Sequence, residues 1–362
     1  MVGIDSRVWE VYSRLKIGST DVLMIGIYGT GGIGKTTIAR VVYDSFSNQF
    51  EASSFLYDVR ETYERQGLVP LQEKLLSDIL RERDVRVRDI FEGVVLIKRS
   101  LYYKKVLLVL DDVNELDQLK FLVDDHSWCG PGSRIIIATR DKHLLTKHGV
   151  DKIYSPAEMS NEEALRLFSL TCFGSEHTPE GYKEMSNHVV SYARGLPLAI
   201  QFLGSHLVNR SIPEWKSCLD GLENNIPTEL LQVFQISYYG LQEFEKETFL
   251  HMACFFNGED QKHTADILDS LGLNAQIGLG ELMNKSLLNL SLDKNCWRMH
   301  PLVQQMGREM VCRECPKFPW RRSRLWLPKD IDDVLTHNKV SNYVEIFNLN
   351  IDPFFIKENK HL

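Results

Sequence analysis

A glycine-rich loop between an apolar strand and a helical stretch constrains this fold more than any other feature. Residues 29–37 read Gly-Thr-Gly-Gly-Ile-Gly-Lys-Thr-Thr, and they follow the apolar run Val22–Tyr28. The spacing G-x-x-x-x-G-K-T in this context predicts a phosphate-binding loop, with Lys35 facing the β- and γ-phosphates and the Thr36 hydroxyl holding Mg²⁺. The alternative is a glycine-rich turn without a ligand. Because strand, loop, lysine, threonine and helix come in order, we predict that the chain binds a nucleoside di- or triphosphate.

The first 150 residues alternate strand and helix signals, which predicts a parallel sheet with helices on both faces. A short strand is expected at Phe55–Val59, and an unbroken apolar strand covers 104–113 and ends in two carboxylates, Asp111 and Asp112. Acids at the carboxyl end of such a strand catch phosphate-bound Mg²⁺ in phosphate-loop folds, and Asp111 is the better candidate. Asp112 could orient an attacking water, or it could cap the next helix.

A further strand at 132–140 ends in Arg140. Strand ends on one edge of a parallel sheet converge on the ligand, so Arg140 could reach a γ-phosphate, although a lone arginine at a strand end can also be a surface residue. We expect an extra strand between the phosphate-loop strand and the acidic strand. This arrangement is typical of switch-type and motor ATPases rather than of small nucleotide kinases.

The second half of the chain is predicted to be helical. Ser160 and Glu163 form a capping box, Gly195 is a candidate C′ residue, and Pro197 stands in the first turn of the next helix. Two β-like pieces at 286–290 and 295–299 follow further helices, which indicates a winged helix. Its usual use is DNA recognition, but an acidic chain with few basic residues on 243–272 makes that the minority interpretation.

A last helix is expected to begin near Met299-His-Pro301, with His300 just before its first turn. A histidine at a helix N-terminus is well placed to donate a hydrogen bond to phosphate. Spacing alone favours a core or a surface residue over a ligand at His300.

Composition excludes some classes of function. The net charge of −7 argues against a general nucleic-acid binder. No apolar run approaches the roughly 20 residues that a membrane span needs, and no signal peptide is expected. Seven scattered cysteines suit a reducing compartment, so we expect the cytoplasm, with the nucleus as an alternative. Cys312-x-x-Cys315 has no second pair at zinc-site spacing, which favours two free thiols over a metal or redox site.

In their order along the chain, these motifs resemble the NB-ARC module of plant disease-resistance proteins, a phosphate-loop ATPase of the STAND class. The resemblance covers about residues 1–330, and Asn114 after the acidic strand points to the TIR-type branch. The matching segments are Val2-Gly-Ile-Asp5, the phosphate loop, Val109-Leu-Asp-Asp-Val113, Gly132-Ser-Arg-Ile-Ile-Ile137, Gly195-Leu-Pro-Leu-Ala199, Phe249-Leu-His-Met-Ala-Cys-Phe-Phe256 and Met299-His-Pro301.

The resemblance implies a fold class and four segments. These are an α/β P-loop nucleotide-binding domain with a parallel sheet (residues 1–152), an all-α helical domain (153–225), a winged-helix domain (226–318) and a linker toward leucine-rich repeats (319–362). It also implies an ADP/ATP switch of plant innate immunity that is ADP-bound at rest, activated by exchange to ATP, and at most a slow ATPase. A conventional P-loop ATPase and a winged-helix DNA-binding regulator are the alternatives.

The resemblance further implies a role for each residue of the site. Val2, Ile4 and Pro197 would border the adenine, Arg140 would sense the γ-phosphate, and His300 would contact the ADP β-phosphate. The phosphates and Mg²⁺ would be held by the loop and its flanking residues, Gly29, Gly31, Gly32, Ile33, Gly34, Lys35, Thr36 and Thr37, with Asp111 as the second magnesium ligand and Asp112 as the candidate catalytic group.

Two departures from the family pattern stand out. The family motif reads Met-His-Asp, whereas Pro301 occupies the third position here, which removes a carboxylate expected to cap the helix and predicts a weaker resting state. The family's TIR domain before this module and its leucine-rich repeats after it are not recognised in the sequence, so we expect a fragment or a truncated member. In the full family we expect these domains as partners, with a homo-oligomer forming on activation.

Overall fold

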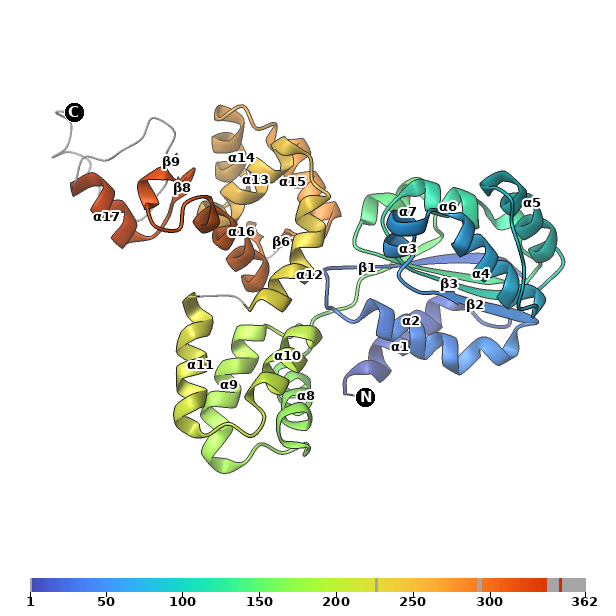
Figure 1. The fold of residues 1–362 in the computed structure, drawn as a ribbon, viewed down its shortest axis with the longest axis horizontal. Coiled ribbons are helices and arrows are strands. Elements are labelled where there is room, and N and C mark those ends of the chain that lie inside the picture. The colour runs from blue at the N-terminus through green and yellow to red at the C-terminus, as the bar shows by residue number, and fades with distance from the viewer. Residues whose placement is uncertain (1, 225–226, 292–294, 337–344, 347–362) are drawn as a thin grey trace. The chain divides into compact units, whose positions relative to one another are not determined.

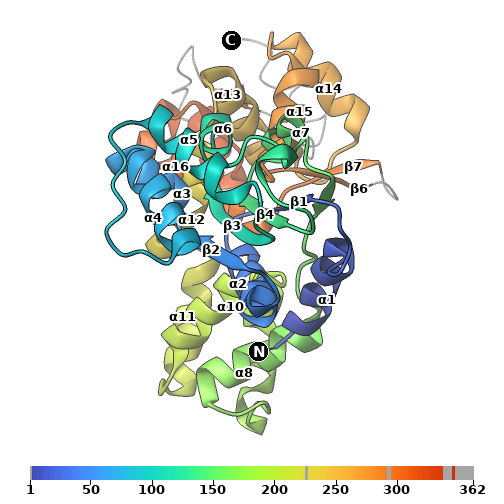
Figure 2. The same cartoon turned by 90° about the vertical axis from the view of Figure 1, so that its right-hand side faces the viewer.

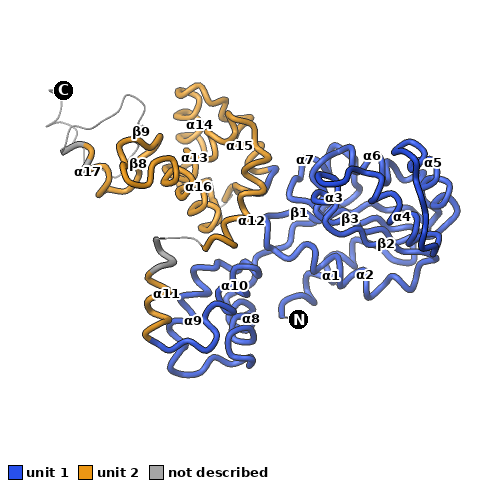
Figure 3. The backbone as a smooth tube through the Cα atoms, viewed as in Figure 1, with its two compact units in different colours: residues 1–212, 284–286 blue, residues 213–283, 287–362 orange. Residues whose placement is uncertain are grey.

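The computed structural model describes residues 2–224, 227–291, 295–336 and 345–346. The described part of the chain separates into two compact units (Figure 3). Unit 1 comprises residues 1–212 and 284–286, and unit 2 comprises residues 213–283 and 287–362. The predicted boundary at residues 225 and 226 lies outside the described residues, as do 337–344 and 347–362 of the predicted linker. The four predicted domain ranges stay predictions.

Unit 1 is built around a parallel sheet (Figure 1). Its five strands lie in the order β2-β3-β4-β1-β5. Strand β4 lies between β1, which leads into the phosphate loop, and β3, which carries the acids. The predicted α/β fold class is therefore confirmed for this half of the chain. The strands are β1 (Leu23–Tyr28), β2 (Ala52–Leu56), β3 (Val106–Val113), β4 (Arg134–Thr139) and β5 (Lys152–Tyr154).

Helices cover both faces of this sheet because alternate side chains of the central strands are apolar on each face. Helices α1 and α2 lie on one face of the sheet and α4 to α7 on the other (Figure 2). Leu107 and Val109 of β3 belong to the core with α1 and α2, whereas Leu108 and Leu110 belong to the core with α4 to α7. The helices are α1 (Ile4–Leu15), α2 (Lys35–Phe46), α3 (Val59–Gln66), α4 (Val69–Leu80), α5 (Ile90–Leu101), α6 (Leu116–Leu122) and α7 (Lys142–His148).

Three further helices of unit 1 pack against one another after β5. They are α8 (Asn161–Phe173), α9 (Lys183–Ala193) and α10 (Pro197–Leu207). The predicted capping box is present, because the Ser160 side chain accepts from the Glu163 backbone N–H and the Glu163 carboxylate accepts from the Ser160 N–H. Gly195 follows α9 with φ +71°, and Pro197 is the first residue of α10. These local signals therefore place each helix end as the sequence predicts.

Unit 2 is helical, with a small antiparallel hairpin of β6 (Asn289–Ser291) and β7 (Cys296–Arg298). Its central helix α16 (Pro301–Glu314) packs against α12, α13 and the π-helical turn that continues α13, and Gly307 permits this close approach because a Cβ there would lie 2.5 Å from the Ala253 Cβ. The other elements of this part are α11 (Ile212–Asn224), α12 (Thr228–Tyr239), α13 (Glu243–His251), the π-turn Met252–Phe256, α14 (Gln261–Ser270), α15 (Ala275–Asn284), β8 (Arg324–Leu325), α17 (Pro328–Thr336) and β9 (Glu345–Ile346).

Candidate nucleotide-binding site

The phosphate loop connects the end of β1 to the start of α2, as the sequence predicts. Two of its glycines, Gly32 and Gly34, have φ of +83° and +97°, a conformation that side chains with a Cβ rarely adopt. Gly34 directly precedes α2, whose first residue is Lys35. The loop therefore ends at a helix N-terminus, where backbone N–H groups and the helix dipole favour an anion.

Lys35 is buried, and its ammonium group is held by the loop itself. Its Nζ donates to the carbonyl oxygens of Gly29 at 2.8 Å and of Thr30 at 3.0 Å. Burial, followed by the repulsion of Arg140, lowers the pKa of Lys35 to about 7. The lowered pKa means that burial disfavours the charged ammonium form of Lys35. A phosphate group close to Nζ would favour this charged form again, and the ammonium would in turn attract the phosphate.

The side chains of Thr36 and Asp111 contact each other. The Thr36 hydroxyl lies 3.0 Å from both carboxylate oxygens of Asp111, which is buried at the end of β3. Burial raises the pKa of the Asp111 carboxyl to about 6. The described residues contain no cluster of three or more metal-ligating side chains. One hydroxyl and one carboxylate nevertheless suit Mg²⁺, which takes its remaining ligands from phosphates and water.

Asp112 lies beside this pair but faces two guanidinium groups. One carboxylate oxygen accepts from Arg60 Nε at 2.9 Å, and the other lies 3.5 Å from Arg140 Nε. The residue has φ +55°, a strained conformation for aspartate that is common at functional sites. Its alternative role as a helix cap is wrong, because Glu115 caps α6. Sequence reasoning missed Arg60, although it follows β2 at the same edge of the sheet.

Two adjoining hollows in unit 1 are lined by the predicted site residues other than Gly29 and His300. The first, of about 310 Å³, is lined on its phosphate side by Gly31, Gly32, Gly34, Lys35, Thr36, Thr37, Asp111, Asp112 and Arg140. The second, of about 210 Å³, is mostly apolar, and its lining includes Val2, Ile4, Ile33, Gly34, Thr37 and Pro197. Gly34, Thr37 and Pro197 line both. A charged chamber next to an apolar one matches the two halves of a nucleotide, its phosphates and its base.

The start of α10 rests directly on the phosphate loop. The Leu198 backbone N–H donates to the Gly32 carbonyl at 3.2 Å, and a Cβ on Gly32 would lie 2.8 Å from the Leu198 Cβ. Pro197, as the first residue of α10, needs no hydrogen-bond acceptor for its nitrogen. The helical part of unit 1 therefore supplies one wall of both hollows.

His300 lies in unit 2, and its predicted contact with the β-phosphate stays a prediction. It is the N-cap of α16, because its ring Nδ1 accepts from the Leu302 N–H at 3.2 Å. The ring also stacks on Phe234, with centroids 6.5 Å apart. The helix therefore keeps a side-chain cap although the family's carboxylate is missing at Pro301, and the weaker resting state stays a prediction. Pro301 occupies the first helical position, and the preceding histidine caps the helix instead.

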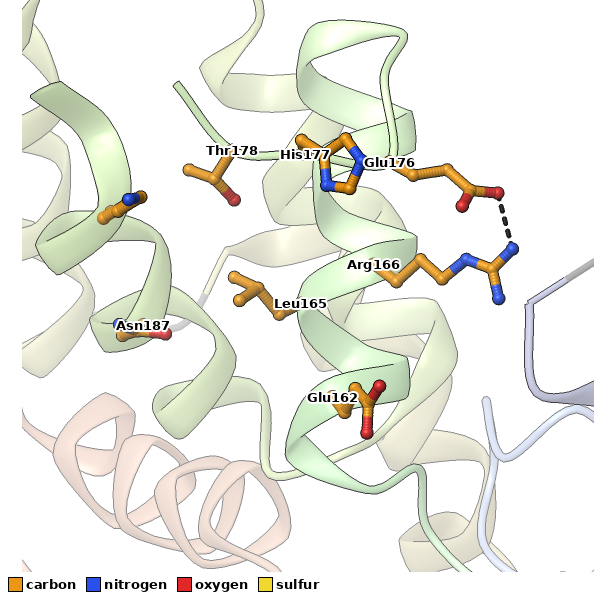
Figure 4. Close-up of a pocket in the computed structure, with 8 residues that line it drawn as sticks. Glu162, Leu165, Arg166, Glu176, His177, Thr178 and Asn187 are labelled. Atoms are coloured by element: carbon orange, nitrogen blue, oxygen red, sulfur yellow. Dashed lines mark hydrogen bonds and ion pairs between the residues drawn. The ribbon is translucent and has the colours of Figure 1, made fainter. Parts of the chain in front are cut away.

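A larger hollow, of about 740 Å³, lies between α8 and α9, away from the loop (Figure 4). Its lining combines acids and bases, and Arg166 is paired with Glu176 at 2.6 Å. This hollow is unsuited to a polyphosphate, because its lining contains two carboxylates, Glu162 and Glu176, and no glycine-rich loop. We therefore take the smaller pair of hollows as the nucleotide site.

Comparison with known proteins identifies the family. The NB-ARC domain model matches residues 4–178, and the model of the winged-helix domain of Roq1-like disease resistance proteins matches residues 242–315. The chain belongs to the NB-ARC family of plant disease-resistance proteins. The TIR-type resemblance predicted from the sequence and the expected fold class with a winged helix are confirmed. The chain is a nucleotide-binding module of this family.

Relatives agree with this assignment, and a solved structure agrees with the fold. The chain is similar to the disease resistance protein RUN1 of Vitis rotundifolia, with 44% identity over 97% of this chain and 26% of the relative. It is 41% identical to the TMV resistance protein N of Nicotiana glutinosa, over 93% of this chain and 30% of that protein. This NB-ARC chain therefore spans less than a third of either relative. The Walker-type ATPase PABY2304 of Pyrococcus abyssi shares the fold, with a TM-score of 0.54 and 14% identity over 85% of this chain and 96% of that one.

Within the part of the chain that the structure describes, no helix is both long and apolar enough to cross a membrane.

Proposed function

We propose that this NB-ARC chain is an ADP/ATP-binding molecular switch of plant innate immunity, which holds ADP at rest and is activated by exchange to ATP. The observation that carries the proposal is the convergence of Lys35, the Thr36–Asp111 pair and Arg140 on one loop. In this proposal Lys35 and the loop bind the phosphates, Thr36 and Asp111 hold Mg²⁺, and Val2, Ile4 and Pro197 border the adenine.

The arrangement of Asp112 favours a switch over a steadily turning enzyme. Both of its carboxylate oxygens already contact guanidinium groups, so an attacking water would have to compete with Arg60 and Arg140 for this carboxylate. Arg140 lies at the same sheet edge, where a third phosphate would compete with Asp112 for its guanidinium. Binding of ATP would therefore rearrange this cluster, whereas binding of ADP would leave it unchanged.

The remaining parts of the proposal concern the complete protein. We propose that a TIR domain and leucine-rich repeats flank this module, that activation forms a homo-oligomer, and that the protein acts in the cytoplasm, with the nucleus as the alternative compartment. These proposals rest on the similarity to disease-resistance proteins of which this chain spans only a part.

The first experiment identifies the nucleotide that co-purifies with the protein. We expect ADP in near-stoichiometric amount in the wild type and none in Lys35→Ala. Lys120→Ala, at a surface lysine paired with Asp117, is the matched control and should keep its nucleotide. Full occupancy in Lys35→Ala would overturn the assignment of the site.

The second experiment measures ATP hydrolysis over many turnovers. A switch should hydrolyse ATP barely beyond one equivalent per molecule in the time that an enzyme would complete many cycles. Asp112→Ala should abolish the slow reaction if Asp112 supports it. Steady turnover in the wild type would instead favour a conventional ATPase.

A further inference from the structure

Arg7, in the first part of α1, makes an unusually complete set of contacts. Its Nε donates to the Ala157 carbonyl at 3.1 Å, and Nη2 donates to the Glu158 carbonyl at 2.9 Å. Nη1 and Nη2 each lie 3.1 Å from one carboxylate oxygen of Glu163, and Nη1 also donates to the Gly3 carbonyl. The five N–H donors of the guanidinium thus meet five acceptors, a geometry that only arginine can satisfy.

These contacts join three walls of the apolar hollow. Gly3 lines the hollow together with Val2 and Ile4, and the carbonyls of 157 and 158 precede Met159, which also lines it. Glu163 belongs to α8, which contributes Leu167 and Leu170 to the same hollow. Arg7 also lies at the edge of the hollow. One side chain therefore fixes the spacing between the N-terminal segment, the loop after β5 and helix α8.

The Arg7–Glu163 pair is sheltered and charged. The side chain of Arg7 is 12% exposed and that of Glu163 is 28% exposed. The hydrogen bonds from Arg7 lower the pKa of Glu163, so the carboxylate stays ionised. Glu163 also accepts from the Ser160 N–H as part of the capping box, which fixes its position on α8. The pair is therefore a rigid connection rather than a mobile surface contact.

We propose that the Arg7–Glu163 pair is a clasp that sets the width of the base-binding hollow and thereby gives the site its affinity for the adenine base. Arg7 is a positioning residue in this proposal, because it acts through the walls of the hollow, and none of its hydrogen bonds above goes to the phosphate loop. The inference rests on the proposed nucleotide function. It goes further by naming the residues through which the base, in addition to the phosphates, would contribute to the binding affinity.

The distinguishing measurement compares ADP with pyrophosphate, which has the phosphates but no base. We expect Arg7→Gln to weaken Mg-ADP binding about tenfold while the dissociation constant of Mg-pyrophosphate changes less than about twofold, since only the base half is disturbed. Glu163→Gln should act in the same direction. The double variant should be no weaker than Arg7→Gln alone, because both changes break one connection.

Arg14→Gln is the matched control, because Arg14 pairs with Glu10 on the same helix. It should leave both dissociation constants unchanged. Equal weakening of ADP and pyrophosphate by Arg7→Gln, or no weakening of either, would overturn the clasp. If the wild type binds neither ligand, the proposed nucleotide function itself fails, which is a different result.

Gly3→Ala should open the clasp without removing a charge, and Gly174→Ala is its matched control. Gly3 has φ +65°, and a Cβ there would lie 2.8 Å from Glu163 Oε1, whereas Gly174 has φ +67° with nothing within 4 Å of a Cβ. Both Gly→Ala changes strain the backbone alike, so the midpoint of thermal unfolding should fall in both variants, and it should fall further in Gly3→Ala because the added methyl group also displaces Glu163. Only Gly3→Ala should reduce the ratio of ADP to pyrophosphate affinity. The same ratio in both variants would contradict the proposal.

Discussion

Gly32→Ala tests how the phosphate loop is seated against α10. The new methyl group would face two costs in the folded state. The first is the left-handed backbone at φ +83°, which costs about 1–2 kcal/mol for a residue with a Cβ. The second is the approach to Leu198, whose Cβ and Cδ2 would lie 2.8 and 3.1 Å from the added atom. A Cβ cannot swing aside as the end of a side chain can, so α10 must shift.

Gly34→Ala isolates the first cost. Gly34 has φ +97°, yet a Cβ there meets nothing within 4 Å. Overpacking typically costs about 1–3 kcal/mol, so we expect Gly34→Ala to lose about 1–2 kcal/mol of unfolding free energy and Gly32→Ala about 2–5 kcal/mol. For a unit of this size, about 1 kcal/mol corresponds to roughly 2–4 °C in the midpoint of thermal unfolding. The two variants should therefore differ by several degrees.

The assay is thermal unfolding of the two variants and the wild type after removal of nucleotide, followed by circular dichroism. A second-site change provides the decisive comparison. Leu198→Gly removes the side chain that the methyl group added at position 32 would strike, so Gly32→Ala combined with Leu198→Gly should lose less than the sum of the single changes. Equal losses in the two glycine variants, or strict additivity in the double variant, would refute the packing argument.

Three further predictions concern the resting state, the metal and pH. Pro301→Asp places a carboxylate in the first turn of α16, worth about 0.3–1 kcal/mol, and should slow ADP release up to about fivefold; an unchanged release rate would rule this out. Asp111→Asn should bind ADP no better with Mg²⁺ than with EDTA, whereas the wild type should gain from Mg²⁺. Burial lowers the pKa of His251 to about 3, so below pH 6.5 only the unfolded chain takes up this proton. Stability should fall by up to about 1.4 kcal/mol per pH unit as pH drops from 6.5 toward 3. His251→Gln should flatten the dependence of the unfolding free energy on pH, measured by denaturant titration at several pH values. An unchanged dependence would show that His251 is not its source.

The parts of the fold that the sequence predicted well are those with a local chemical signature. The capping box of Ser160 and Glu163, the glycine at 195 and the proline that opens α10 each act through their own backbone, so neighbouring residues suffice to recognise them. The phosphate loop has the same property, because its spacing fixes its chemistry.

The strand expected at Phe55–Val59 lies instead at Ala52–Leu56, and its placement shows where local reasoning fails. Ser54 is polar but buried. Its burial is tolerated because its hydroxyl donates to Asp78 on α4 at 2.7 Å. A buried serine looks like a loop residue in the sequence until its distant partner is known. The contacts of Arg60 with Asp112 and of Arg7 with Glu163 were missed for the same reason, since each joins residues far apart in the chain.

The proposed switch needs a group whose contact with the nucleotide differs between the resting and the activated state. Every predicted site residue except His300 belongs to unit 1, so unit 1 carries the groups needed to hold a nucleotide. A ligand can shift a conformational equilibrium only by its differential affinity for the two states, and in the proposed switch a contact from unit 2 would add to the difference that Arg140 and Asp112 provide in unit 1. His300 has the chemistry for this role. Because Nδ1 accepts from the Leu302 N–H, the neutral ring carries its proton on Nε2, which can donate to a phosphate oxygen. Capping α16 and donating to phosphate would thus use opposite ring nitrogens, so in the proposed switch the helix cap would select the tautomer that donates.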